Sequence, residues 1–247
     1  MSRTTIHLDA ALIAALVAAG CGGNDKAADT PAVHVGAVVY RDTFDDNRGR
    51  WLEGSRDGMT LGLRGDGTLV WSGLEPGQNP SGTLDAPFDE PAPLLSRPTI
   101  PEGLAVSASV EMRKGAALRV VYCRAQGPRD APPRAWYEFG IDGRQAMIRK
   151  MSITAPPKVL ARAEQIVPNG RRVRVTAYCV PDGDGKLVLV LRLDGREVAR
   201  ATEAKPLPPA TKGLYATSGL HAYPRPDTPV PASLAWYDFE VRRAAIT

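Results

Sequence analysis

The feature that most constrains this chain is a succession of short strand-like runs separated by tight turns. The clearest are residues 117–123, 136–141, 144–150, 172–179, 187–193 and 196–202. Asp-Gly pairs at 142–143 and 194–195 each join two neighbouring runs. Such a pair predicts a β-hairpin, because a type I′ turn needs positive φ at both central residues. We therefore expect an all-β domain.

Further runs extend this pattern to both sides. Residues 60–64 and 68–72 flank a Gly-Asp-Gly turn, residues 104–113 alternate apolar and polar, and residues 38–44, 213–218 and 234–241 also read as strands. Residues 73–103, 204–213 and 222–232 are proline-rich and predict loops or edges, because proline cannot donate to a ladder. The run 187–193 is apolar on both faces, which indicates a sheet covered on both sides. About twelve strands and no helix predict one β-sandwich.

The N-terminal residues predict export rather than a folded element. Residues 10–20 form an apolar run that is too short to span a bilayer, and Arg3 precedes it, so residues 1–20 read as a signal peptide. The Ala-Ala-Gly-Cys ending at 18–21 resembles a bacterial lipobox. That resemblance implies a lipid on Cys21 and a protein anchored to the cell membrane outside the cytoplasm, with plain secretion as the alternative. Residues 21–36 predict a flexible tether, and residues 37–247 the folded domain.

The cysteine count bears on the same question. Three cysteines are an odd number for an exported chain, and lipidation of Cys21 would leave Cys123 and Cys179 as a pair. Both lie at the ends of strand-like runs, and disulfides persist outside the cytoplasm. A disulfide is therefore expected, and two buried free thiols are the alternative.

Charge and motif spacing exclude several functions. Thirty-one basic and 27 acidic residues give a net charge of +4 with no block of one sign, so no nucleic-acid partner is expected. Three scattered histidines and two isolated cysteines lack metal-ligand spacing. His221 has no nucleophile elbow beside it. Residues 182–185, Asp-Gly-Asp-Gly, predict a turn rather than a calcium loop, so no cofactor is expected and calcium has no support.

Several short motifs together carry a family resemblance. They are Asp42, Phe44, Asp45 and Trp51 at the opening, and then residues 122–124, 136–141, 147–150, 174–179, 191–198 and 236–241. Over roughly residues 38–243 the chain resembles the concanavalin A-like (laminin-G-like) jelly-roll domains of bacterial surface proteins. The resemblance implies a jelly-roll β-sandwich of two antiparallel sheets. Some relatives belong to a keto-glycoside hydrolase family, so hydrolysis is kept as an alternative function.

Hydrolysis would need two carboxylates that face one cleft. Glu138 with Asp142 is the nearest approach in the middle of the chain, but the turn explains Asp142. Asp238 and Glu240 share one face of the last predicted strand, where a solvated outer face is the simpler explanation. No residue is therefore nominated as catalytic.

Carbohydrate sites combine aromatic platforms with hydrogen-bonding side chains. The nominated ligand-binding residues are Trp71, Trp136, Trp236 and Asp238. Strand alternation predicts that Trp71 and Trp236 point outward, and Trp136 follows a proline-rich loop; the alternative is that tryptophans fill the core. Tyr223 is a further platform candidate. The expected function is non-catalytic recognition of a glycan or a surface protein, and a purely structural envelope module is the other alternative.

Overall fold

The structure is a computed structural model that describes residues 32–46, 51, 53–56, 58–76, 103–127, 134–207, 215–228 and 230–247. The predicted signal peptide, Cys21, most of the tether and most of the proline-rich stretch 73–103 lie outside these residues. Within the described part, no helix is long and apolar enough to cross a membrane.

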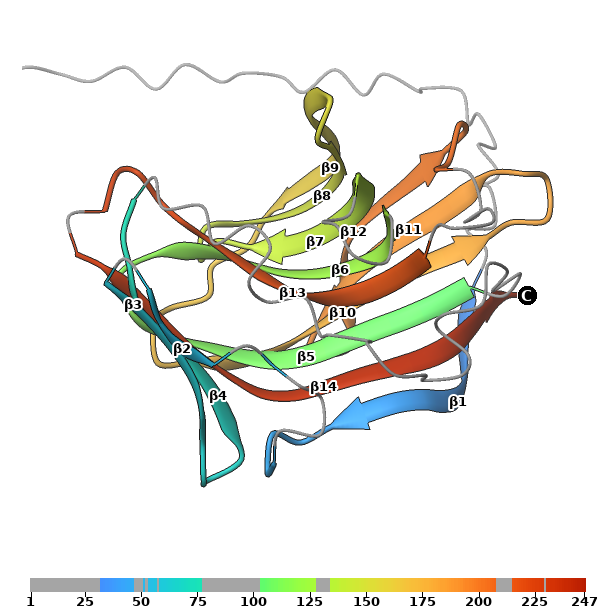
Figure 1. The fold of residues 1–247 in the computed structure, drawn as a ribbon. Helices are drawn as coiled ribbons and strands as arrows, with labels where there is room; N and C mark the ends of the chain where they lie inside the picture. The colour runs from blue at the N-terminus through green and yellow to red at the C-terminus, as the bar shows by residue number, and fades with distance from the viewer. Residues whose placement is uncertain are drawn as a thin grey trace, which may run out of the picture. The chain divides into compact units, whose positions relative to one another are not determined.

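In the described residues, fourteen β-strands form two antiparallel sheets that pack face to face (Figure 1). The strands are β1 (Val33–Asp42), β2 (Gly54–Arg56), β3 (Met59–Arg64), β4 (Thr68–Leu74), β5 (Gly103–Lys114), β6 (Ala117–Gly127), β7 (Ala135–Ile141), β8 (Gln145–Ser152), β9 (Ala155–Glu164), β10 (Arg172–Pro181), β11 (Leu187–Leu193), β12 (Arg196–Glu203), β13 (Tyr215–Pro224) and β14 (Ala232–Ile246). The nine-stranded sheet has the order β12-β11-β10-β5-β14-β4-β3-β2, with β1 also paired to β14. The five-stranded sheet has the order β13-β6-β7-β8-β9.

The long strand β14 lies in the interior of the larger sheet. One of its edges pairs with β5 from Ser233 to Ala244. Its other edge is shared, because residues 232–236 pair with β4 and residues 239–246 pair with β1. Three strands from distant parts of the chain therefore depend on β14 for their partners.

Both predicted Asp-Gly hairpins are present, as β7–β8 and β11–β12. Asp194 and Gly195 have φ values of 50° and 82°, which fits the expected type I′ turn. The first hairpin is closed differently. Gly143 has a φ of 90°, while the Asp142 carboxylate accepts hydrogen bonds of 2.9 Å from the backbone N–H groups of Arg144 and Gln145.

Two boundaries and one strand differ from the sequence-based expectation. β1 begins at Val33, so residues 33–36, which we expected in the tether, belong to a strand, and residues 33–35 pair with the end of β14. β13 runs on to Pro224, which shortens the expected loop at 222–232. β9 was not predicted, because Pro156 and Pro157 fall within it; it forms the edge of the five-stranded sheet, where proline is tolerated.

The core lies between the two sheets, and a disulfide links the sheets across it. Cys123 on β6 is bonded to Cys179 on β10, so one cysteine comes from each sheet, and their Cα atoms are 6.6 Å apart. The predicted pairing is therefore confirmed. Alternate residues of facing strands fill the space between the sheets, including Val121 of β6 and Val175 of β10.

Candidate functional site

The outer face of the five-stranded sheet carries a compact group of polar and aromatic side chains. Along β7, Tyr137 and Phe139 point into the core, so strand alternation places Trp136 and Glu138 on the opposite face. β8 adds Arg149 to this face, and β13 adds two more residues. We call this group the Glu138 cluster, and it consists of Trp136, Glu138, Arg149, His221 and Tyr223.

Glu138 lies at the centre of the cluster and is only 1% exposed. Its Oε1 accepts hydrogen bonds from the indole Nε1 of Trp136 at 2.8 Å and from the hydroxyl of Tyr223 at 2.5 Å. Its Oε2 accepts one from Arg149 Nη2. His221 Nδ1 lies 3.7 Å from Oε1 and 3.1 Å from the Tyr223 hydroxyl. The carboxylate therefore fixes both aromatic side chains.

These contacts decide the charge of Glu138. Burial alone would raise its pKa, because an apolar surrounding disfavours the charged form. The contact with His221, the positive charge of Arg149 and the Tyr223 hydroxyl act in the opposite direction and together outweigh burial. The result is a pKa of about 2, so Glu138 is ionised at neutral pH.

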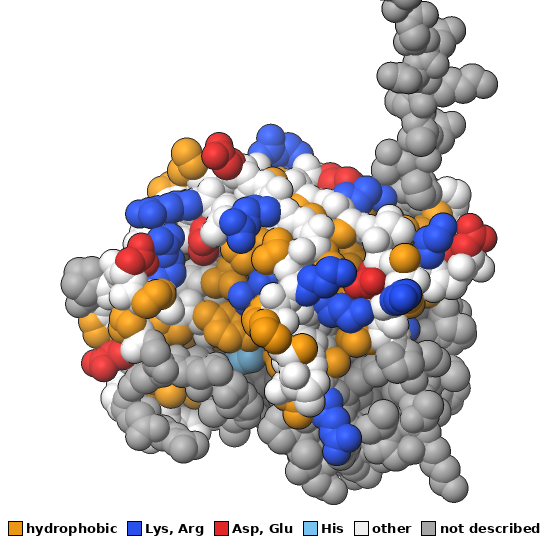
Figure 2. Space-filling view, turned by 90° about the horizontal axis from the view of Figure 1, so that it is seen from above, with side chains coloured by type: hydrophobic (Ala, Val, Ile, Leu, Met, Phe, Trp, Pro, Cys, Tyr) orange, Lys and Arg blue, Asp and Glu red, His pale blue; other side chains and the backbone are white. Residues whose placement is uncertain are grey.

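An apolar floor surrounds the cluster. Leu118, Val120, Tyr122 and Met147 are buried on this same outer face and pack with Trp136 and Tyr223. Gly140 makes room for them, since a Cβ atom there would lie 2.7 Å from Leu118 Cδ1. Figure 2 looks down on the molecule from the top of Figure 1 and shows hydrophobic side chains gathered in the middle of the surface with Lys and Arg side chains around them.

Two side-chain nitrogen atoms of the cluster have unused hydrogen-bonding capacity. His221 Nε2 and Arg149 Nε are buried and have no hydrogen-bond partner among the residues that the structure describes. Trp136 and Tyr223 are half-buried, so part of each ring is exposed. The arrangement offers aromatic surface next to unused polar atoms, which suits a ligand with both C–H faces and hydroxyl groups.

The nominated tryptophans do not share one site. Trp136 lies in the Glu138 cluster, but Trp71 and Trp236 are completely buried and pack against each other in the core, with ring centroids 5.5 Å apart. The prediction that both point outward is therefore wrong. On β4, Leu69 and Trp71 share the core face. On β14, a bulge between Trp236 and Asp238 shifts the alternation, so that both Trp236 and Phe239 face inward.

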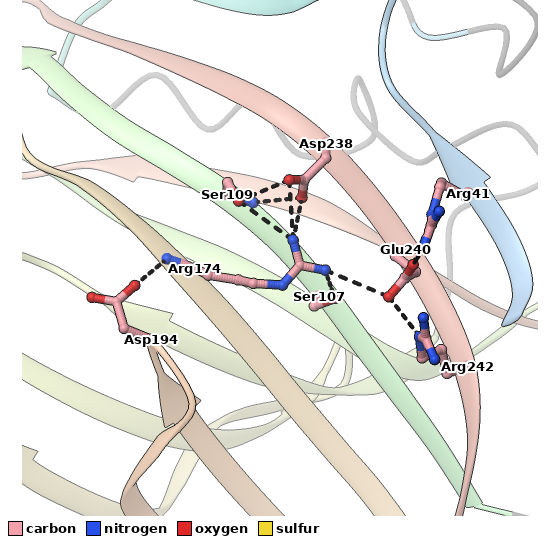
Figure 3. A network of polar contacts seen from close by, with 8 residues as sticks. All are labelled: Arg41, Ser107, Ser109, Arg174, Asp194, Asp238, Glu240 and Arg242. Carbon is pink, nitrogen blue, oxygen red and sulfur yellow. Dashed lines mark hydrogen bonds and ion pairs between the residues drawn. The ribbon is translucent and has the colours of Figure 1, made fainter. Parts of the chain in front are cut away.

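Asp238 lies on the outer face of the nine-stranded sheet, far from Trp136 in the sheet arrangement. It accepts hydrogen bonds from the backbone N–H of Ser109 at 2.9 Å, from the Ser109 hydroxyl at 2.8 Å and from Arg174 at 3.0 Å (Figure 3). Glu240 lies on the same face and contacts Arg174 as well. Because Glu138 belongs to the other sheet, it does not form a carboxylate pair with Asp238 or Glu240.

Tyr223 was named as a platform candidate, but Arg149 and His221 were not predicted as site residues, and the grouping of all three was not predicted. Arg149, His221 and Tyr223 come from two strands, and β13 reaches them only because it pairs with β6 rather than with a sequence neighbour. The available signal was the alternation of polar and aromatic residues at 136–138 and 221–223. That signal gives a shared face only once the strand order is known.

The Asp-Gly-Asp-Gly stretch forms the predicted turn between β10 and β11. The Asp182 carboxylate accepts hydrogen bonds from the backbone N–H groups of Asp184 at 2.9 Å and Lys186 at 3.0 Å. In the described residues, no group of three or more His, Cys, Asp or Glu side chains lies close enough together to hold a metal ion.

Comparison with known proteins identifies the fold. No family model matches the chain, and no curated protein matches it. A protein of unknown function with a galectin-like fold from Bacillus subtilis has a TM-score of 0.56 and 12% sequence identity, covering 86% of this chain and 99% of that one. An endo-β-1,4-glucuronan lyase from the fungus Trichoderma reesei has a TM-score of 0.50 and 10% identity, covering 83% and 95%. The chain has a jelly-roll β-sandwich fold of two antiparallel sheets, in agreement with the predicted concanavalin A-like architecture.

Proposed function

We propose that this protein recognises a glycan without cleaving it, and that the Glu138 cluster is the binding site. The observation that carries the proposal is the fixed position of two half-buried aromatic side chains on one buried carboxylate. Trp136 and Tyr223 both donate to Glu138 Oε1, so their rings are held in place before any ligand arrives. Such pre-organisation lowers the entropy lost on binding.

The unpaired nitrogen atoms of His221 and Arg149 also support a glycan ligand. His221 Nε2 and Arg149 Nε are buried without a partner in the described part of the chain, and a sugar hydroxyl can both donate and accept a hydrogen bond. A ligand that pairs these nitrogen atoms should bind more tightly than one that leaves them unpaired, so the site can discriminate between ligands. A glucuronan lyase is among the structures with a similar fold, so a fold of this kind occurs in at least one enzyme that acts on a polysaccharide.

A thermal-shift screen of the full chain against a glycan panel, with and without calcium, tests the proposal. A glycan that binds the native state raises the melting temperature by mass action, by an amount that depends on its concentration relative to Kd. We expect a shift with one sugar class, its loss in Trp136→Ala and a smaller loss in Trp136→Phe, which keeps an aromatic ring. Ile166→Ala, at a position that is 83% exposed and outside the cluster, is the control and should shift like the wild type.

Two outcomes would contradict the proposal. A flat response at millimolar glycan would favour a surface-protein partner or a structural role. A shift that Trp136→Ala leaves unchanged would place glycan binding elsewhere on the molecule.

We also propose that a lipid on Cys21 holds the domain at the outer side of a bacterial membrane. The support is the lipobox-like ending at residues 18–21 and the odd number of cysteines, since Cys123 and Cys179 are already bonded to each other. In Cys21→Ala the protein should leave the membrane fraction and appear in the soluble fraction. Unchanged membrane association would refute the anchor, and secretion of the wild type would favour the alternative.

A further inference from the structure

We propose that the outer face of the nine-stranded sheet is a second binding surface, which takes an anionic polysaccharide. It is separate from the Glu138 cluster, which lies on the other sheet, and does not depend on the function proposed there. The surface, here called the arginine face, carries the outward-pointing arginines of β1, β5, β10, β11 and β14: Arg41, Arg113, Arg172, Arg174, Arg192 and Arg242.

Strand register places these arginines on one face of the sheet, spread over five strands. Val173 and Val175 of β10 lie in the core, so Arg172 and Arg174 face outward. Across the sheet, one row runs from Arg41 through Glu240 to Ser107. The same row continues through Thr176 to Arg192. The row therefore joins β1, β14, β5, β10 and β11.

The positive charge of the face exceeds what its acids can neutralise. Among the described residues of these five strands and the neighbouring β12, the carboxylates on this face are Glu111, Glu197, Asp238 and Glu240, against seven arginines, because β12 adds Arg200 to the six. Glu240 illustrates the imbalance, because this one buried carboxylate pairs with Arg41, with Arg174 at 3.5 Å and with Arg242 at 2.7 Å (Figure 3). A guanidinium group has five N–H donors, so each of the three retains donors that Glu240 does not occupy.

These donors face solvent. The side chain of Arg41 is 54% exposed, that of Arg174 38% and that of Arg242 35%. Guanidinium groups bind carboxylate and sulfate oxygens with two parallel hydrogen bonds, which lysine cannot do. The face is therefore built to recognise oxyanions.

The arginine side chains are also held in place. Arg174 lies across the small side chains of β5 and donates to the Ser107 hydroxyl at 2.7 Å and to Asp238 at 3.0 Å. The Arg172 guanidinium carbon lies 3.3 Å from the centroid of the Tyr237 ring. Fixing a long side chain in advance lowers the entropy cost of binding.

The spacing favours a polymer over a small anion. Neighbouring strands lie about 4.8 Å apart, so a row across five strands extends for about 19 Å. A small anion would meet one or two arginines of the face, whereas an extended chain with an acidic group on each sugar could meet several of them together. Linked contacts of this kind add strongly to affinity.

Binding of the full chain to dextran sulfate and to uncharged dextran of the same length tests the proposal, because the two polymers differ only in charge. We expect binding to dextran sulfate that weakens as salt is added, and none to dextran. Arg41→Gln with Arg242→Gln should weaken binding about tenfold or more, since charge-assisted hydrogen bonds are lost. Lys158→Gln with Lys186→Gln removes the same charge at exposed positions off this face and should change affinity less than about twofold.

A second double variant provides an independent test in case the first one does not fold. Arg172→Gln with Arg192→Gln leaves the contacts of buried Glu240 intact and should weaken binding similarly. Equal binding of the two dextrans, or an equal loss in the lysine control, would overturn the proposal. Loss of dextran sulfate binding in Trp136→Ala would place the binding at the Glu138 cluster and would also overturn the proposal. Stronger binding to phosphatidylglycerol vesicles than to dextran sulfate would assign the face to a membrane instead.

Discussion

Glu138 is ionised although it is buried on the five-stranded sheet. Its lowered pKa makes the stability of the folded protein depend on pH. The folded-state pKa of about 2 lies below the ordinary value of 4.5. A depressed pKa contributes stability above pH 4.5, and this contribution is lost as the pH falls from 4.5 towards 2. A shift of this size corresponds to about 3 kcal/mol.

Glu138→Gln tests this at the residue scale. The amide retains the shape and can still accept from Trp136 and Tyr223, but it leaves the mostly buried Arg149 without its counter-ion. We expect the free energy of unfolding to fall by on the order of 3 kcal/mol at pH 7, because breaking a buried pair leaves a buried charge without a counter-ion. Between pH 4.5 and pH 2 the variant should lose less stability than the wild type. Urea unfolding at several pH values measures the stability of the variant at pH 7 and its pH dependence. Parallel pH profiles of variant and wild type would contradict the lowered pKa of Glu138.

At the scale of the element, the bulge in β14 decides which side chains reach the core. Tyr237 is the extra residue between the pairs Trp236↔Val110 and Asp238↔Ser109. The bulge leaves Tyr237 out of the register, so Trp236 and Asp238 act as successive positions of the strand. If Tyr237 were kept in regular alternation instead, Asp238 and Glu240 would turn toward the core and Phe239 toward solvent. Deletion of Tyr237 should therefore keep Phe239 in the core and leave a protein that unfolds cooperatively, as measured by near-UV circular dichroism and urea titration. Deletion of Pro226, in the exposed turn after β13, is the control and should also leave a folded protein; loss of cooperative unfolding on deletion of Tyr237 alone would contradict the assignment of Tyr237 as the extra residue.

This bulge also shows how far the sequence could be interpreted. Turn chemistry and period-two alternation predicted the hairpins, the two-sheet sandwich and the disulfide, because these depend on local residues and on a simple count. The alternation argument reversed Trp236, since an extra residue changes the facing of a strand without leaving a mark in composition. The strand order was not available either, so Glu138 and Tyr223, which are 85 residues apart, could not be brought together.

At the scale of the whole molecule, the bond between Cys123 and Cys179 ties the two sheets together. It closes a loop of 56 residues, which in the chain-entropy model contributes about 4 kcal/mol to stability. Cys123→Ala with Cys179→Ala should lower the free energy of unfolding by roughly this amount. The denatured, unreduced domain should show no free thiol from these two residues. Titration of two thiols, or an unchanged urea midpoint in the double variant, would refute the pairing.

β14 lies late in the chain but in the interior of the larger sheet, and this affects the order in which the domain can fold. Ribosomes and export channels deliver a chain from its N-terminal end, so β14 emerges after every strand that it must pair with. β1, β4 and β5 lack their shared neighbour until then, and contacts between such distant segments form slowly. We expect the domain to stay open until its last strand arrives. If the chain is exported as we propose, this order would keep it unfolded during its passage through the membrane.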